Sequence, residues 1–589
     1  MLLKPLYAER YRLITLAVFI YLAILSWGKL GDLVIDIGHE VETPTRILDG
    51  QILYRDIQSY YSPLANYANA WILMIFGRKL AVFYGIGLSL SLLFTITLYQ
   101  LVRPIVNEKY ACLTCTAVLA YCAFSPGLSN LILPYSYAAT YGTLITAVLF
   151  LVIQKYLARP HFLTPLFMGT LCGLALLAKQ EYGIACIGVV FLVLTLWHLE
   201  GAPRSSLLFK LRKLAVDLLL VLVPLVLVVA LPLWYFLQHV SWHQLMDENL
   251  FPFQKFAVYK NSELFKVSPA KTLAVWGKNF LVFLASSAPV VLALWAIRHR
   301  VKSEWGQILV ATAVAAPFSF LLLFLFTKAN GLPVLPLSRL HWSIGVFAVV
   351  ALGYRFIAPA LERPTALLLL AIFTNVFLLN LRWLLSMEFY AIYSIFLVVL
   401  FGMTLGLLEP YIKQYVLPSS YLSVCVILML IVQTRNFSGY DGTVTSPYGT
   451  MHTDQKPAMT QAFNQTLAFL KREVRPEDRN KVLVLSEGML LNFLSGTHSP
   501  SRQTTFIPGV LLNAQEETAF IQEMDRKGVR TIVLVDRPYP EWTYKEYRNF
   551  NPLVYRWITQ GHRQVAAFPE AKDGKNLIRI YQPFAAGAS

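Results

Sequence analysis

Long apolar segments alternate with short polar ones along the first 435 residues. Several of these segments approach the roughly 20 residues that a helix needs to cross a bilayer. The pattern predicts thirteen membrane spans, of which the third and fifth are short enough to be tilted or to end before the far interface. They lie near residues 11–28, 81–102, 111–126, 137–156, 164–178, 183–198, 215–237, 272–297, 307–327, 340–358, 365–383, 388–408 and 416–433.

The pattern changes in the tail, which we take as residues 436–589. KVLVLSE (481–487) is typical of a buried strand, and EETAFIQEMDRKG (516–528) has helical periodicity and ends in glycine. The segments VRTIVLVD (529–536) and LIRIY (577–581) predict two more strands. The expected fold is therefore mainly α, a polytopic membrane helix bundle over residues 1–435 with a small C-terminal α/β soluble domain.

Composition supports a membrane protein. Of the 589 residues, 56% are hydrophobic and only 14% are charged, with a mean hydropathy of +0.55, whereas soluble domains carry about 25% charged residues. No small-residue cleavage site follows residues 11–28, so we expect this first span to be retained rather than removed as a signal peptide. Six cysteines lie within or beside apolar segments; Cys112 and Cys115 resemble half of a metal site, but packing explains them better.

The net charge of +17 does not indicate nucleic-acid binding, because Lys and Arg form short clusters between the spans. Loops rich in Lys and Arg stay cytoplasmic, which predicts a cytoplasmic N-terminus. The loop at 29–80 and the tail then face the opposite side of the membrane, which is the periplasm or a lumen. Several basic residues break the trend on that face, and an anionic ligand such as a lipid-linked phosphate would explain them: Arg46, Arg55, Arg78, Lys79, Lys179, Lys255, Lys328, Arg339 and Arg382.

The loop at 29–80 is long and rich in acids and aromatic residues, which is typical of a functional loop. If a helix starts in IDIGHE, Asp36 and Glu40 share one face with His39 beside them. Two carboxylates there could serve as a base and its orienting partner, or hold a divalent metal such as Mg²⁺ or Mn²⁺. The alternative is a solvated polar start to an interfacial helix.

Further along this loop, Arg55 and Asp56 in YRD predict an ion pair that fixes the loop, rather than direct chemistry. Tyr60 and Tyr61 suit an interfacial aromatic belt, and a platform that stacks on sugar is the alternative.

Two later outer segments carry basic residues. LLAKQEYG (176–183) places Lys179 and Glu181 at the outer end of a span, where Lys179 either contacts a phosphate or snorkels to the interface. TKANGLPVLPLSRLHW (327–342) adds Lys328, Arg339 and His341, which either stabilise a leaving phosphate or anchor the interface.

These residues resemble the first outer loop of the GT-C glycosyltransferase superfamily. The pattern IDIGHE, TPTRILDGQILYRDI and SPLANYANAWILMIFG is similar to bacterial family-39-type members, akin to protein mannosyltransferases and lipid A aminoarabinose transferases. LPYSYAATYG (133–142) and GLALLAKQEYG (173–183) fit as well, and VLVLSEGMLLNFLSGTHSPSR (482–502) resembles the periplasmic domain of such proteins. HSPSR (498–502) is typical of a loop, and we assign it no chemistry.

The resemblance implies an inverting transfer of a sugar from a polyprenyl-phosphate donor to a glycan, lipid or protein acceptor at the bacterial inner membrane. It makes Asp36 the essential acid, with Glu40 as a second catalytic candidate. Many relatives have Asp-Glu in sequence there, whereas this chain separates Asp36 and Glu40 by three residues. The other outer residues above are candidates for substrate binding: His39, Arg55, Asp56, Tyr60, Tyr61, Lys179, Glu181, Lys328, Arg339 and His341.

Two other functions remain open. A transporter or flippase of lipid-linked sugars predicts Gly- or Pro-broken helices in repeated halves, and the sequence has no such repeat. A non-catalytic scaffold with the same fold would keep the layout and tolerate the loss of Asp36.

Overall fold

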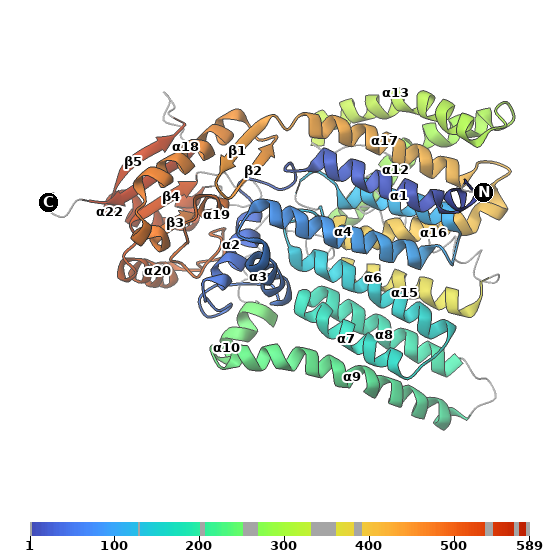
Figure 1. Ribbon diagram of the computed structural model, residues 1–589, viewed down its shortest axis with the longest axis horizontal. Helices are drawn as coiled ribbons and strands as arrows, with labels where there is room; N and C mark the ends of the chain where they lie inside the picture. Colours follow the sequence, from blue (N-terminus) through green and yellow to red (C-terminus); the bar gives the residue numbers. More distant parts are fainter. Residues whose placement is uncertain are drawn as a thin grey trace.

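The computed structural model describes residues 3–127, 130–200, 206–250, 269–330, 361–381, 391–535, 546–569 and 577–584. It consists of a bundle of long helices and a smaller domain built around a sheet (Figure 1). The N-terminus lies at one end of the bundle and the sheet domain lies beyond the other end.

The bundle helices match every predicted span along the sequence except the one near 340–358, which lies outside the described residues. They are α1 (Leu3–Ser26), α4 (Leu80–Val102), α5 (Glu108–Val118) with η1 (Leu119–Ala123), α6 (Tyr137–Ala158), α7 (Leu163–Ala178), α8 (Gln180–Glu200), α9 (Leu207–Leu237), α12 (Pro269–Ile297), α13 (Glu304–Asn330), α15 (Arg363–Asn380), α16 (Ile395–Ile412) and α17 (Pro418–Ser438).

Within the described part of the chain, eight helices are long and apolar enough to cross a membrane: α4, α6, α8, α9, the 277–297 part of α12, α15, α16 with its preceding turn, and α17. The chain is therefore a membrane protein, and the total of thirteen membrane spans remains a prediction. Burial separates the lipid-facing helices from the central ones. Only 11% of the apolar window of α9 is buried, against 72% for the window at Ile392–Ile412, so α9 faces lipid and α16 forms the core of the bundle.

The predicted loop at 29–80 contains two short helices, α2 (Ile37–Leu48) and α3 (Leu64–Phe76), which pack against each other. Both lie at the end of the bundle that faces the sheet domain (Figure 1). The second half of α3 exposes Trp71, Met74, Ile75 and Phe76, each at least 65% accessible. Such an apolar edge suits contact with lipid, so α3 places the α2 segment at the membrane surface.

The tail contains the predicted α/β elements. β3 (Val482–Leu485) and β4 (Thr531–Val535) pair in parallel, and α20 (Ala514–Arg526) connects them. The sheet order is β3-β4-β6-β5, with β6 (Ile578–Pro583) antiparallel to β4 and to β5 (His562–Phe568). The pattern predicted β3, α20, β4 and β6 correctly and did not predict these elements: the β1 (Gly442–Ser446) and β2 (Gly449–Thr453) hairpin, α18 (Pro457–Glu473), α19 (Leu490–Ser495), α21 (Tyr547–Phe550), α22 (Pro552–Gly561) and β5.

The tail packs directly on the start of the polypeptide. Backbone hydrogen bonds join His452 to Gly28 at 2.7 Å and Leu80 to Tyr448 at 2.8 Å. α19 packs against α2, where Gly38 lies so close that an added Cβ would be 2.5 Å from the backbone nitrogen of Leu490. Only glycine can lie this close to the backbone of α19. The α2 helix is therefore held between the helix bundle and the tail.

Candidate functional site

Asp36 precedes the first turn of α2 in a strained backbone conformation. Its φ is 60° and its ψ is −50°, and Ile37 N donates to Ile35 O across it at 2.7 Å. This is the rarer, strained form of the γ-turn, and such conformations cost on the order of 1–3 kcal/mol and cluster at active sites. Asp32 fixes the backbone that leads into this turn, because its Oδ1 accepts hydrogen bonds from Val34 N and Ile35 N.

Glu40 and His39 lie in the first turn of α2, directly after Asp36. Glu40 is 3% exposed; its Oε2 accepts from the backbone N–H of Tyr137 at 2.8 Å, and its Oε1 lies 3.3 Å from His39 Nε2. Because Tyr137 begins α6, the carboxylate sits at a helix N-terminus, where negative charge is favoured. Glu40 therefore joins α2 to α6 and orients the His39 ring.

His39 lies in an acidic environment. Burial lowers the pKa of His39, but the hydrogen bond and charge of Glu40, with the charges of Asp36 and Glu487, outweigh burial and raise this pKa above its usual value. The imidazolium form of His39 is thus stabilised.

Lys179 ends α7 and is 3% exposed. Its ammonium lies over three tyrosine rings, 4.6 Å from the centroid of Tyr61, 5.0 Å from Tyr135 and 5.4 Å from Tyr393. It donates one hydrogen bond to the Tyr135 hydroxyl at 3.3 Å, and that hydroxyl bonds to Tyr393 at 2.8 Å. Among the described residues, no carboxylate lies within ion-pair distance of Lys179. We call this arrangement the tyrosine cage.

Tyr61 joins the two parts of the site. The Lys179 ammonium contacts the Tyr61 ring, and the centroid of this ring lies 6.1 Å from the centroid of the His39 ring. The structure therefore brings together five of the residues that the sequence proposed, from α2, the segment after it and α7: Asp36, His39, Glu40, Tyr61 and Lys179.

The remaining predicted residues lie apart from this group or are not among the described residues. The expected ion pair of Arg55 and Asp56 is confirmed, with Arg55 Nη2 2.7 Å from Asp56 Oδ2. Asp56 also accepts from Ile52 N; burial raises the pKa of Asp56, but these hydrogen bonds and the Arg55 charge lower it overall. Tyr60 is half-buried beside Tyr61, and Glu181 lies in the first turn of α8.

The second outer segment is largely outside the described residues. Lys328 lies near the end of α13, but its side chain is not described, and neither Arg339 nor His341 is among the described residues. Their roles remain predictions.

The divalent metal that the sequence suggested stays a prediction. Glu40 already uses both oxygens, and in the described part of the chain no three His, Cys, Asp or Glu side chains gather as metal ligands. We therefore derive no step through a metal. Cys112 and Cys115, for which we expected packing, are both buried in the bundle.

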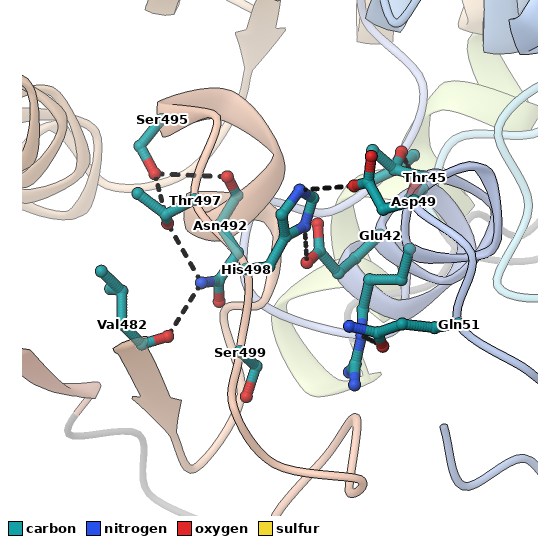
Figure 2. A network of polar contacts seen from close by, with 12 residues as sticks. Glu42, Thr45, Asp49, Gln51, Val482, Asn492, Ser495, Thr497, His498 and Ser499 are labelled. Carbon is teal, nitrogen blue, oxygen red and sulfur yellow. Dashed lines mark hydrogen bonds and ion pairs between the residues drawn. The ribbon is translucent and has the colours of Figure 1, made fainter. Parts of the chain in front are cut away.

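The sequence analysis did not predict a polar contact between α2 and the segment HSPSR (498–502). We call this contact the clamp (Figure 2). His498 lies between two carboxylates, with Nδ1 2.8 Å from Glu42 Oε1 and Nε2 2.9 Å from Asp49 Oδ2. Buried Arg46 donates to the backbone oxygens of Asp56 and Ser501. The spacing of Glu42, Arg46 and Asp49 at i, i+4 and i+7 marks one helix face and is the signal that could have indicated this surface.

Arg502 completes the clamp. It donates to the backbone oxygens of Tyr54 and Arg55 and forms an ion pair with Glu248 at 2.8 Å. Tyr54 has a φ of 69°, and its hydroxyl donates to Tyr61 O at 2.9 Å. The clamp therefore fixes the segment that carries the Tyr61 ring.

The clamp predicts a pH-dependent stability. Burial lowers the pKa of His498, but the Glu42 hydrogen bond and the charges of Glu42 and Asp49 raise it overall. Because the folded pKa is raised above the unfolded value of about 6.5, this stabilisation is complete below about pH 6.5 and is lost as the pH rises through the folded pKa. We expect His498→Gln to lower stability by about 3 kcal/mol in acid, since Glu42 is fully buried, and by less in alkali.

Thermal unfolding at several pH values, with limited proteolysis of the tail, measures this effect. The matched control is His243→Gln, because His243 also pairs with a carboxylate, Asp247, but is 82% exposed. Equal effects of the two substitutions, or a loss that does not depend on pH, would contradict the clamp.

Comparisons with known proteins show the fold. No protein-family model and no curated protein matches the chain. The oligosaccharyltransferase of Archaeoglobus fulgidus in the apo form is similar in structure, with a TM-score of 0.50 and 11% identity over 95% of this chain and 80% of that one.

Two further solved structures have lower scores. ArnT from Cupriavidus metallidurans bound to undecaprenyl phosphate has a TM-score of 0.45 and 14% identity over 98% of this chain and 99% of that one. The oligosaccharyltransferase AglB of Archaeoglobus fulgidus, with an inhibitory peptide and a dolichol-phosphate, has a TM-score of 0.46 and 12% identity over 88% of this chain and 69% of that one. The chain thus shares the fold of the Archaeoglobus fulgidus oligosaccharyltransferase, and it has the membrane helix bundle with a small α/β domain that its sequence led us to expect.

Proposed function

We propose that this protein is a glycosyltransferase that moves a sugar from a polyprenyl-phosphate donor to an acceptor on the periplasmic face of the bacterial inner membrane. The acceptor is a glycan, a lipid or a protein. The fold and the outer-loop motifs support this class, and the geometry around Asp36 and Lys179 supports the chemistry.

The observation that carries the proposal is the buried ammonium of Lys179. A buried charge costs several kcal/mol unless it is paired, and the tyrosine cage offers ring faces and one hydroxyl but no carboxylate. Cation–π contacts offset part of this cost. Because the described residues place no carboxylate beside this ammonium, a phosphate would pair with it, which supports a ligand with negative charge.

Asp36 supplies the base in the proposed reaction. The acceptor hydroxyl attacks the anomeric carbon while the bond from that carbon to the phosphate oxygen breaks, and Asp36 takes the hydroxyl proton. The configuration inverts because attack and departure occur on opposite faces. Polyprenyl phosphate leaves with the bonding electrons, and Lys179 balances its charge. Glu40 contributes by orienting His39, and we expect Lys328 and Arg339 to add positive charge near the phosphate.

The proposed orientation has two supports. The N-terminus and the tail lie at opposite ends of the bundle (Figure 1), and the short Lys- and Arg-rich loops favour a cytoplasmic N-terminus. A site at the tail end of the bundle would then face the periplasm, with the prenyl chain between helices in the membrane.

The test is an assay of the purified protein in liposomes with undecaprenyl-phosphate-linked pentoses and hexoses. Lipid and protein fractions of a bacterial envelope serve as acceptors. Sugar transfer with stoichiometric release of undecaprenyl phosphate is the expected result. Movement of the intact donor across the liposome membrane without release would instead indicate a flippase, and neither activity would indicate a scaffold.

A further inference from the structure

The tail contributes a turn to the site. Residues 486–490 follow the carboxyl end of β3, which is the end where parallel strands commonly present functional loops. Ser486 is fixed on both sides, because its hydroxyl donates to Val535 O and its backbone oxygen accepts from Phe506 N, both at 2.8 Å. Gly488 has a φ of +113°, and the next residues touch Gly38 in α2. The turn is therefore rigid and adjoins the residues that carry the proposed chemistry.

Glu487 lies in this turn and is 5% exposed. Its charge acts on His39 together with the charges of Asp36 and Glu40. The centroid of the Tyr61 ring lies 6.1 Å from that of His39, and the Lys179 ammonium contacts the same ring. Three carboxylates from two parts of the chain thus act on one imidazole, and one of them, Glu40, lies 3.3 Å from it.

His39 has one nitrogen available for a ligand. Its Nε2 contacts Glu40, whereas Nδ1 is buried and has no hydrogen-bond partner among the described residues. An imidazolium donates from both nitrogens, and a buried donor without an acceptor costs about 1–3 kcal/mol. An oxygen of a bound ligand would relieve this cost.

We propose that Glu487 of the tail is a positioning residue of the membrane site, holding His39 as an imidazolium whose Nδ1–H donates to a phosphate oxygen of the lipid donor. This inference rests on the proposed function. It gives the tail a part in the site, because Glu487 acts on the substrate through His39. Two cations, His39 and Lys179, both of which lie near the Tyr61 ring, then contact the phosphate.

The first experiment measures the protonation of His39 without any substrate. Exchange of the imidazole C2 hydrogen for deuterium, followed by mass spectrometry of the peptide containing His39, gives the pH at which the ring loses its proton. We expect Glu487→Gln to move this midpoint to lower pH and Glu487→Asp to restore most of it. Glu473→Gln is the control, because Glu473 is an exposed acid of the same tail that pairs with Arg472, and it should leave the midpoint unchanged.

The second experiment measures binding of undecaprenyl phosphate to the full-length protein in detergent at pH 7.5. We expect Glu487→Gln to weaken binding on the order of tenfold, as for the loss of one nearby charge in a partly buried site. Glu487→Asp should recover most of the affinity. Thermal unfolding of each variant shows that it is folded.

The outcomes separate the inference from the proposed function. An unchanged His39 midpoint in Glu487→Gln overturns the inference even if the wild type binds undecaprenyl phosphate. A shifted midpoint with unchanged affinity overturns the contact from His39 to the phosphate. Failure of the wild type to bind contradicts the proposed donor, while the exchange profile still decides whether Glu487 controls His39.

Discussion

Asp36→Asn is expected to reduce sugar transfer by about 10³-fold or more while leaving the protein folded. A positioned base contributes about 10²- to 10⁴-fold to proton transfer, and an amide cannot take the proton of the acceptor. Asn also tolerates a positive φ nearly as well as Asp does, so the strained turn at residue 36 is preserved. Activity with a polyprenyl-phosphate sugar and the thermal unfolding temperature are the two measurements.

Asp49→Asn is the matched control for this substitution. Asp49 follows α2 and pairs with Arg78 and His498, so its loss should weaken the clamp and leave most of the transfer activity. Wild-type turnover in Asp36→Asn would remove Asp36 from the mechanism and favour the scaffold interpretation.

Lys179→Met is expected to change activity and stability in opposite directions. Met has a similar length and no charge. Replacing a buried ion pair by apolar side chains is often neutral or stabilising by about 1–4 kcal/mol, and Lys179 has no carboxylate partner among the described residues, so we expect its replacement to be neutral or stabilising as well. The same change removes the cation that stabilises the leaving phosphate, so transfer should fall about 10²- to 10³-fold. Thermal unfolding and transfer rates measured on one preparation test both effects.

Lys109→Met provides the contrast. Lys109 at the start of α5 forms an ion pair with Glu304 at 2.5 Å, so its loss should lower stability and leave transfer unchanged. If Lys179→Met is strongly destabilised and retains activity, Lys179 is a structural residue and the phosphate site lies elsewhere.

Local sequence patterns predicted the helices and strands whose formation depends on their own apolar residues. A lipid environment demands long apolar helices, and the apolar runs match the helices of the bundle wherever the structure describes them. Buried strands such as VLVL and the amphipathic α20 were visible in the same way. The hairpin of β1 and β2 has few apolar residues and was missed because packing against Gly28 and Leu80 stabilises it.

The site could be predicted only in part. Asp36 was visible as an acid of the first outer loop and Lys179 as a charge at the end of a span, but the strain at residue 36 depends on a backbone angle that a sequence does not display. The tyrosine cage joins residues 61, 135 and 393, each of which alone is typical of an interfacial belt. The effect of Glu487 on His39 and the contact of His498 with Glu42 each join residues more than 440 positions apart, and no local pattern encodes such pairings.

The most direct test of the account is an electron cryomicroscopy structure of the protein with undecaprenyl phosphate. The account predicts phosphate density within hydrogen-bonding distance of Lys179 Nζ, on the side of Tyr61 and His39, with Asp36 facing the same space and the prenyl chain between membrane helices. Phosphate bound away from the tyrosine cage, or Asp36 directed away from the bound phosphate, would contradict it.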